Sequence, residues 1–493
     1  MYGYGYKINS GLVVGAGGGG GGFTNTYSTS FDGVDDYVHL GDDNSDLQPT
    51  GAFSLSVWVK FDSLTGIQGI WEATSTGGGG NNGYVLWKSS ANKFQFYMRE
   101  GGVWKIASAT TTVTTGTWYH ILCTWDGSST SKIFVNGTEE GSQSVSSINY
   151  NITTTINLGG YQSESISKPY QIDGNIDEAS LFHSEISIGD VWDGSGSPTD
   201  LSLLPTPPVA WYRNGDNGSY KSPQWLIPSN ENKDKVSNYS FQFDGVDDFI
   251  NIGNAISFEY NDTFSYSFWI NPDSDSGVKY LFSKYASSRG ILIYLNSSSS
   301  SGNNTLNFNI YNKGSGTPSG RKYITTNSTN MALPNEWTNI VITYDGSGLG
   351  SGISFYKNGV AQSVTVTNDS LASNTIVTSQ DAYISGNNFA SSFYPGKQDE
   401  WAIFNTELSS ADALAIYNSG EPTTLPSGAV AHYKMGEDAT FSGGVWTVPD
   451  AVGSNDGTSN AMTIEDRVGD APNSSNNALS YNMDEADRVE DTP

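Results

Sequence analysis

The chain repeats itself, and this internal duplication constrains its fold more than any other feature. The phrase SFDGVDDYVHLG begins at residue 30, and its near copy QFDGVDDFINIG begins at residue 242. Four further pairs of phrases follow in the same order along the 493 residues. Self-similarity at a long and nearly constant offset indicates that one structural unit occurs twice.

The paired phrases alternate apolar and polar residues and end in turn signals, which is typical of short β-strands. Their offset drifts from 212 at the first pair to 222 at the last, as loop insertions in one copy would cause. The further pairs are FSLSVWV with FSYSFWI, WYHILCTWDG with WTNIVITYDG, KIFVNGT with SFYKNGV, and GNIDEASLFHSEIS with GKQDEWAIFNTELS. The third pair ends in Asn-Gly, the strongest short signal for a hairpin.

Each unit is expected to close with one brief helix. In the second unit this is SSADALAIYNSG, with Ser409 or Ser410 as the N-cap and Gly420 as the stop. Cys123, the only cysteine, has apolar neighbours and is predicted to be a small core residue. The predicted core also includes the tryptophans that recur in both units: Trp58, Trp118, Trp269 and Trp337.

Composition excludes several classes of partner. A net charge of −28 with only 23 lysines and arginines argues against a nucleic-acid ligand, which requires clustered cations. No run approaches 18 apolar residues, so no membrane insertion is expected. The acidity itself fits either of two roles, solubility or cation binding.

Five phrases occur in one order in both units: F-D-G-x-D-D-[YF], F-S-x-S-x-W, W-x₆-[WY]-D-G, N-G and D-E-x-x-[IL]-F. This series resembles the LamG-like jelly roll of the concanavalin A-like lectin/glucanase superfamily, over residues 27–195 and 238–420. The resemblance implies an all-β chain with two tandem β-sandwich jelly rolls. The remaining segments would be a flexible glycine-rich N-terminal arm (1–26), a connector (196–237) and a small C-terminal extension (421–493).

Two connector phrases carry a second resemblance. LPTPPVAWYRNGD (204–216) is echoed by LPSGAVAHYKMGE (425–437), and the chain closes with NALSYNMDEADRVEDTP. These phrases resemble those of LamG-bearing structural proteins of marine tailed phages. The resemblance implies a non-enzymatic virion protein, a head decoration or fibre component, made in the host cytoplasm and assembled with capsid or tail subunits. Host-cell glycans and further copies of the chain are additional expected partners.

Two other functions fit the same jelly rolls. One is a free, calcium-dependent carbohydrate-binding lectin, and the other is an accessory binding module of a polysaccharide-degrading system. An accessory module requires a catalytic domain in the same chain, and the sequence shows none. The sequence also shows no secretory leader and no pair of cysteines, which favours the virion hypothesis.

The duplicated acidic phrase is the candidate metal site. Carboxylate and carbonyl oxygens at a turn are ligands that Ca²⁺ prefers, and the LamG resemblance implies calcium near the edge of the sandwich. The alternative is that Asp-Gly makes a tight turn in which the carboxylates bind local amides. The candidate ligands are Asp32, Asp35 and Asp36 in the first unit and Asp244, Asp247 and Asp248 in the second. Asp177 and Asp399 are further candidates if their strand returns beside the first strand.

Two alternating phrases are the candidate ligand-binding strips. In KFQFYMRE, Phe94, Phe96 and Met98 are predicted to face the core, as are Leu306, Phe308 and Ile310 in LNFNIYN. Amide and aromatic groups on the outward face can stack on a sugar and hydrogen-bond to it, although the same strips also fit an ordinary solvated face. The outward residues are Gln95, Tyr97 and Arg99 in the first unit and Asn307, Asn309 and Tyr311 in the second.

No catalytic constellation is visible. None of His39, His120, His183 and His432 is kept at the equivalent position of the repeat. Glucanases of the superfamily use a Glu-x-Asp-x-Glu strand that places carboxylates on one face. The nearest phrase is EADRVE at 485–490, which is one residue too long and lies outside both jelly rolls.

The two ends of the chain are expected to lack a core. Residues 15–22 are glycine except Ala16, so this stretch fits either a passive tail or an arm that becomes ordered against a neighbouring subunit. Residues 438–493 are rich in Asn, Asp, Gly and Ser. Both ends are therefore predicted assembly contacts, and mild proteolysis should remove about the first 20 residues.

Overall fold

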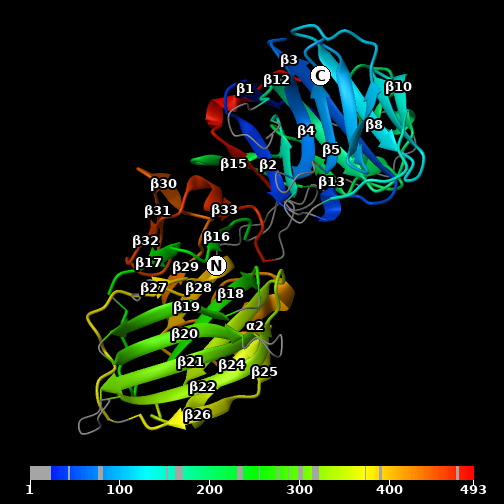
Figure 1. Ribbon diagram of the computed structural model, residues 1–493. Helices are drawn as coiled ribbons and strands as arrows, with labels where there is room; N and C mark the ends of the chain where they lie inside the picture. The colour runs from blue at the N-terminus through cyan, green and yellow to red at the C-terminus, as the bar shows by residue number, and fades with distance from the viewer. Residues whose placement is uncertain are drawn as a thin grey trace, which may run out of the picture.

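The computed structural model describes most of the chain in two β-sandwich units, which form the two lobes of Figure 1. The glycine-rich stretch that underlies the expected arm lies outside the described residues. These are 24–42, 45–75, 82–150, 154–160, 170–229, 237–254, 256–274, 277–286, 288–297, 304–313, 321–371, 373–387, 391–472 and 477–493.

Each unit packs a narrow sheet against a wide sheet, as a jelly roll does. In the described part of unit 1 the narrow sheet has eight antiparallel strands, in the order β10-β9-β8-β3-β12-β1-β35 with β13 beside β12. They are β1 (Ser28–Asp32), β3 (Phe53–Phe61), β8 (Trp118–Trp125), β9 (Thr130–Val135), β10 (Thr138–Ser144), β12 (Asp173–Phe182), β13 (Ala210–Tyr212) and β35 (Arg488–Val489).

The wide sheet of unit 1 has nine strands among the described residues, in the order β14-β15-β34-β2-β11-β4-β5-β6-β7. They are β2 (Tyr37–Asp42), β4 (Gln68–Ser75), β5 (Gly83–Lys88), β6 (Phe94–Glu100), β7 (Val103–Ser108), β11 (Thr154–Leu158), β14 (Ser219–Lys221), β15 (Gln224–Ile227) and β34 (Ala478–Tyr481).

Unit 2 repeats the narrow sheet in the order β25-β24-β23-β18-β28-β16-β33, with β29 beside β28. The strands are β16 (Ser240–Asp244), β18 (Phe264–Pro272), β23 (Thr338–Tyr344), β24 (Ile353–Lys357), β25 (Val360–Gln362), β28 (Pro395–Phe404), β29 (Ala429–Tyr433) and β33 (Arg467–Val468).

The wide sheet of unit 2 has ten strands in the described part of the chain, in the order β26-β22-β21-β20-β19-β27-β17-β32-β31-β30. They are β17 (Phe249–Asn251), β19 (Gly277–Ala286), β20 (Arg289–Ser297), β21 (Asn304–Lys313), β22 (Arg321–Ala332), β26 (Thr365–Asp369), β27 (Tyr383–Ile384), β30 (Thr440–Ser442), β31 (Val445–Val448) and β32 (Gly457–Asn460).

Helices are short and lie at the ends of strands. In α2 the N-cap is Ser409, whose hydroxyl accepts from the amide of Asp412, so the predicted helix and cap are confirmed. The predicted stop at Gly420 was wrong, because the left-handed Asn418 already ends the helix two residues earlier. No described helix is long and apolar enough to cross a membrane. The helices are α1 (Ile188–Val191), α2 (Ser410–Tyr417) and the 3-10 turns η1 (Ser45–Leu47), η2 (Leu201–Leu203), η4 (Gly350–Gly352), η5 (Asn418–Gly420), η6 (Ile464–Asp466) and η7 (Glu485–Asp487).

Strand alternation places the core as predicted. The odd-numbered neighbours Gln95 and Tyr97 are half-buried, whereas all six residues predicted to face inward are fully buried in the two cores. The Asn-Gly phrases also form the expected hairpins, because Asn136 and Asn358 adopt the left-handed backbone that the tight turn requires, with φ of 44° and 50°. The sequence thus predicted both the strands and the faces they bury.

The recurring tryptophans are a partial exception. Trp58 and Trp269 are buried, but they lie on the outer side of the narrow sheets, where Trp58 packs on Trp192 and Trp269 on Tyr417. Trp118 and Trp337 are only half-buried and donate their indole N–H groups to Asp491 and Asp470. Burial confirms the prediction for Trp58 and Trp269. The prediction was wrong for Trp118 and Trp337, because their indoles instead bind carboxylates from the late part of the chain. Cys123 is buried in the core as predicted.

The connector and the C-terminal extension are part of the sheets. β13 pairs with β12, while β14 and β15 reach the wide sheet of unit 1 only through β34, which comes from the end of the chain. β35 likewise pairs with β1, and in Figure 1 the red end of the chain lies beside the blue β1. Unit 1 is therefore built from both ends of the chain, and unit 2 is inserted between β15 and β34.

Unit 2 forms the same additional strands from one continuous stretch. β29 pairs with β28, β30 to β32 extend the wide sheet beside β17, and β33 pairs with β16. The β31–β32 hairpin is closed by residues 449–456, and the equivalent position in unit 1 holds the whole of unit 2.

The prediction that residues 438–493 lack a core was wrong. Their composition is polar, but a few apolar side chains complete cores that the jelly rolls begin. Trp446 and Met462 are buried in unit 2, and Ala478 and Met483 are buried in unit 1. Between the units, Leu226, Tyr239, Leu479 and Tyr481 form a small apolar cluster of their own.

Candidate functional site

The predicted strip of unit 1 lies on the outer face of the wide sheet, on β6. Trp87 on β5 and Trp104 on β7 flank Tyr97, with ring centroids 4.4 and 5.9 Å from its ring. Gln95 accepts from the Trp87 indole at 3.3 Å and from the Tyr97 hydroxyl at 3.1 Å, and the Arg99 guanidinium lies 5.1 Å from the centre of the Trp104 ring. The structure thus joins the three predicted residues to two tryptophans and makes one aromatic patch.

The predicted strip of unit 2 is arranged differently. Asn307 and Asn309 are on the outer side of β21, but they are buried, with 7% and 3% of their surface exposed. The Asn309 amide donates to the hydroxyls of Tyr294, at 3.3 Å, and Tyr311, at 2.9 Å. The two asparagines therefore form a floor beneath tyrosines and do not project to solvent.

Two rows of tyrosines flank this floor. In one row Tyr280 on β19 and Tyr294 on β20 are opposite each other, with ring centroids 5.5 Å apart. In the other row Tyr285 on β19 and Tyr311 on β21 have ring centroids 5.0 Å apart. Burial raises the pKa of Tyr311 to about 12, and the neighbouring Tyr294 adds to the shift. The Tyr311 hydroxyl therefore stays protonated at physiological pH and can both donate and accept hydrogen bonds.

The floor between the tyrosine rows contains two unpaired polar atoms. Ser283, Leu292 and Asn309 are aligned across β19, β20 and β21 by the strand register. Within the described part of the chain, the Ser283 hydroxyl and the Asn309 carbonyl oxygen have no hydrogen-bond partner, although the residues are 1% and 3% exposed. A buried polar atom without a partner costs free energy unless water or a ligand satisfies it.

The duplicated acidic phrase forms the same tight turn in both units. One Asp32 carboxylate oxygen accepts from the amide of Val34 at 2.7 Å, and Asp36 accepts from the amide of Asp32 at 2.8 Å. Asp244 and Asp248 make the equivalent bonds, at 2.7 and 3.0 Å. These contacts establish the turn role that the sequence offered as one of two alternatives.

The same turns also gather negative charge. One oxygen from each of Asp32, Asp35 and Asp36 lies within 4.8 Å of the others, and Asp244, Asp247 and Asp248 form the matching group. Burial raises the pKa of Asp36 to about 7, and the charges of Asp32 and Asp487 add to it. Burial raises the pKa of Asp248 to about 7 as well, assisted by the charge of Asp466.

Asp487 and Asp466 were missed as members of these groups. They are the last residues of the 3-10 turns η7 and η6, and each approaches the acidic turn of its own unit from the late part of the chain. The available signal was the phrase D-R-V, which occurs twice, at residues 466–468 and 487–489.

Asp177 and Asp399 lie elsewhere. The strand carrying Asp177 does return beside β1, but Asp32 is opposite Asp173, four residues earlier. Four residues of strand span roughly 13 Å, so Asp177 does not reach the turn. It clusters instead with Glu178 and Asp216, and burial together with the charge of Glu178 raises the pKa of Asp177 well above its usual range.

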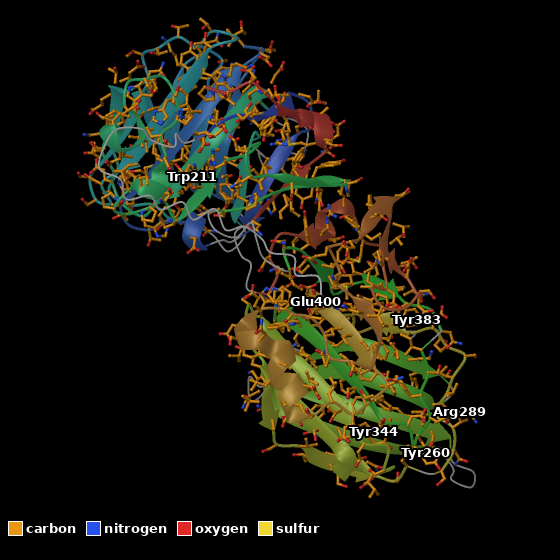
Figure 2. All side chains as sticks on the ribbon, turned by 180° about the vertical axis from the view of Figure 1, so that it is seen from behind. Trp211, Tyr260, Arg289, Tyr344, Tyr383 and Glu400 are labelled. Atoms are coloured by element: carbon orange, nitrogen blue, oxygen red, sulfur yellow. The ribbon has the colours of Figure 1, made fainter. Side chains whose placement is uncertain are left out.

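Each of these buried acids sits beside a glutamate with a left-handed backbone. Glu178 accepts from the Trp211 indole at 2.5 Å and from Arg213 at 3.0 Å. In unit 2 the corresponding Glu400 is 2.5 Å from the imidazole of His432. Figure 2 shows Trp211 in one lobe and Glu400 in the other, so the two clusters are separate. Both anchor the start of their unit, because Asp177 accepts from Asn25 and Asp399 from Ser237.

The fold and the repeated phrases fit one sequence family. The profile of the concanavalin A-like lectin/glucanase superfamily, in its laminin G form, matches residues 32–191 and 244–413, which is more than half of the chain. The chain belongs to this superfamily. Among curated proteins, none is detectably similar to it in sequence.

Solved structures show likeness at low identity. Mouse laminin α1 domains LG4-5 are 12% identical, with 78% of this chain and 89% of that chain covered and a TM-score of 0.27. The CBM40 of a Ruminococcus gnavus sialidase, bound to α2,3-sialyllactose, is 12% identical, covering 33% and 95%, with a TM-score of 0.29. A pentraxin from Limulus polyphemus is 13% identical, covering 33% and 79%, with a TM-score of 0.25.

Glucanases of this superfamily place paired carboxylates on one strand face, and the nearest phrase here does not. Glu485 and Asp487 belong to the turn η7, and Glu490 follows the two-residue strand β35. The phrase therefore closes unit 1 and does not line a sheet face. Of the histidines, His120 is fully buried and bonds to Ser56, and His432 is buried against Glu400.

Proposed function

We propose that the chain is a non-enzymatic carbohydrate-binding protein whose ligand sites are the outer faces of the two wide sheets. The observation that carries this proposal is the floor of unit 2, where the unpaired atoms of Ser283 and Asn309 lie between two rows of tyrosines. Sugars present hydroxyls to such polar atoms and C–H faces to aromatic rings. Membership of a lectin/glucanase superfamily supports the same function.

The aromatic patch of unit 1 is the second site. Tyr97, Trp87 and Trp104 offer ring surface, but Gln95 is already hydrogen-bonded to two of these rings. Unit 1 thus offers stacking and the Arg99 cation, while unit 2 offers hydrogen bonds. The two sites are expected to differ in the glycans that they bind.

A glycan array with the full chain tests the proposal. Tyr311→Ala should reduce binding at the unit 2 site by about tenfold or more, because stacking on one ring contributes roughly 1 to 2 kcal/mol. The control is Tyr260→Phe, a change at another tyrosine of unit 2, which is labelled in Figure 2. This variant should bind glycans as the unaltered chain does. A chain that binds no glycan, or a Tyr311→Ala variant with unchanged binding, would contradict the site.

We also propose that the acidic turns bind calcium. Two oxygens of each turn already accept backbone amides, so a cation would be held by the remaining oxygens of Asp32, Asp35 and Asp36, with Asp487 nearby. The raised pKa values of Asp36 and Asp248 reflect a partly buried negative cluster, which a divalent cation would relieve.

The biological setting that we propose is a virion. The support is the resemblance of the connector phrases to those of phage structural proteins, with capsid or tail subunits and further copies of the chain as partners. Mass spectrometry of purified particles tests this, since the polypeptide should be present in virions. Its presence only as a free secreted protein would instead support the lectin alternative.

A further inference from the structure

Residues 477–491, near the end of the chain, complete unit 1 and are called here the closing segment. Its strand β34 pairs on one side with β2, where Val38 is opposite Ser480, and on the other with β15, where Leu226 is opposite Leu479. Its strand β35 pairs with β1. The hairpin β14–β15 has no other strand partner in the described sheet, so the closing segment connects it to unit 1.

Side chains hold the closing segment along its whole length. Trp225 donates its backbone amide to the Ser480 hydroxyl at 2.8 Å and its indole to the Asp484 carbonyl at 2.6 Å. The Asp491 carboxylate accepts from the Trp118 indole at 3.1 Å and pairs with Lys60. These are anchored contacts at both ends of the segment.

The closing segment is also buried like part of a core. Ala478 and Met483 are 0% and 2% exposed and lie within the unit 1 core. Tyr481 stacks on Tyr37, with ring centroids 5.0 Å apart. Without the segment, the backbone edge of β2 and part of this core would meet water, which costs free energy.

Yet the closing segment is joined covalently to unit 2. Residues 469–476 connect it to β33, the final strand of unit 2. The closing segment does not contribute strands to unit 2, because residues 457–470 supply the equivalent strands and turn there. The segment that completes unit 1 is therefore the C-terminal tail of unit 2.

We propose that unit 1 has a peptide-binding surface, formed by β1, β2 and β15, whose ligand is the closing segment, and that a second copy of the chain can supply this ligand. This is recognition by strand addition, in which backbone pairing gives affinity and side-chain anchors give specificity. The chain's own segment is favoured at low protein concentration, because a short link gives it a high effective concentration. Exchange between copies becomes competitive when many chains fold together.

The test uses the full chain with a protease site introduced within residues 473–476. After cleavage the closing segment stays in place without a covalent link, and a fluorescent peptide of residues 477–493 is added. The peptide should enter the cleaved chain, and the melting temperature of unit 1 should rise with peptide concentration while that of unit 2 stays constant. If the segment is lost on cleavage and unit 1 melts as before, or if no peptide enters even after a heating and cooling cycle, the proposal is overturned.

Two control peptides define the recognition. A peptide with Arg488→Ala should compete about tenfold less well, because it lacks the cation over the Tyr27 ring and the bond to the Gly215 carbonyl. The unit 2 sequence 457–470 should also compete poorly, since Thr458 and Asn460 stand where the closing segment has Leu479 and Tyr481. Equal competition by all three peptides would contradict a specific surface.

Intact chains test the second copy. Two differently tagged full-length chains are unfolded together and refolded at high protein concentration, and they should then purify together through either tag. Chains with Arg488→Ala should purify together to a smaller extent, because their closing segments bind unit 1 more weakly. Complete separation of the two tags after joint refolding would show that the surface accepts only its own segment.

Discussion

The guanidinium of Arg488 lies 3.6 Å from the centre of the Tyr27 ring, so residues from opposite ends of the chain meet on unit 1. In unit 2 Arg467 covers Tyr239 in the same way, at 4.8 Å. Both junctions also include a glycine of the connector phrases, Gly215 or Gly436, whose missing side chain leaves room for the tyrosine. One junction is thus built twice, once from nearby residues and once across the inserted unit.

This equivalence predicts which pieces fold alone. Residues 237–472 contain every strand of unit 2 and should give a cooperative thermal transition when expressed alone. Residues 24–229 should not, because β14 and β15 have lost their connection to the sheet. Circular dichroism during heating measures both outcomes.

A chimera provides the matched control. Joining residues 24–227 to 478–491 through the unit 2 loop, residues 449–456, restores every strand of unit 1 in one short chain. It should recover a cooperative transition. A folded 24–229 fragment, or an unfolded chimera, would contradict the nested arrangement.

A second prediction concerns the space at the junction. A Cβ added at Gly215 would come within 2.7 Å of the Tyr27 Cβ, a distance that real structures avoid. Gly215→Ala should therefore lower the free energy of unfolding of unit 1 by about 1 to 3 kcal/mol. Gly51→Ala, where an added Cβ meets nothing within 4 Å, is the control and should change it little. Denaturant titration measures the free energy of unfolding of both variants. Equal values would show that the junction rearranges to accommodate the added methyl group.

Much of this architecture was readable from the sequence, and the parts that were not share one cause. Alternation in KFQFYMRE predicted which side chains are buried, because that pattern is set locally by the strand. The pairing of β34 with β2 could not be read this way, since it joins residues over 430 positions apart after a whole inserted unit. Long separation along the chain also hid Asp487 and Asp466 from their acidic turns, and it hid the core contacts of residues 438–493, whose composition is polar.

The sites show the same limit. The sequence identified Tyr97 and Tyr311 as outward residues, but it could not show that Tyr294 covers Asn309, because that contact depends on the register of neighbouring strands. Asp177 was assigned to the right strand and the wrong neighbours for a similar reason. A strand pairing was foreseen, but its register places Asp173 beside Asp32 instead.

A third prediction tests the buried acids of unit 1. Arg213 is the cation that pairs with Glu178, at 3.0 Å, and Glu178 is nearly inaccessible to solvent. Arg213→Ala leaves buried carboxylates without that compensation and should lower the free energy of unfolding by about 3 to 5 kcal/mol. Lys434→Ala, at the equivalent position of unit 2, should cost less, because His432 contacts Glu400 there. Equal losses would show that Arg213 acts through packing alone.

A fourth prediction separates calcium binding from a turn role. Millimolar Ca²⁺ should raise the melting temperature relative to EDTA, because the ion binds only the folded turns. Since the pKa values of Asp36 and Asp248 are about 7, protons compete with the ion below that pH, and the rise should be larger at pH 8 than at pH 6. The double variant Asp36→Asn, Asp248→Asn should lose most of the rise. Identical melting curves with Ca²⁺ and EDTA would contradict calcium binding and leave the tight turn as the only role of these aspartates.

The last prediction rests on His120, a buried imidazole at a position where unit 2 has no histidine. His120 is 1% exposed, its Nε2 lies 2.8 Å from the Ser56 hydroxyl, and burial lowers the pKa of His120 from 6.5 to about 3. Unit 2 has Asn339 at this position, which does not titrate. The histidine is therefore neutral in the folded state at pH values where an unfolded chain would protonate it.

Because the unfolded state binds the additional proton, unit 1 should lose stability as the pH falls below 6.5 toward 3, and should keep it above 6.5. At about pH 5, roughly one and a half pH units below the pKa of the unfolded chain, His120 should lower the free energy of unfolding by about 2 kcal/mol, because each pH unit contributes about 1.4 kcal/mol. His120→Asn, which copies unit 2, should remove this part of the pH dependence even if it lowers stability at pH 8. Thermal melts of both chains between about pH 5 and pH 8 measure the difference in slope. Parallel slopes would mean that the imidazole takes up its proton without unfolding unit 1, and that the Ser56 pocket accommodates a charge.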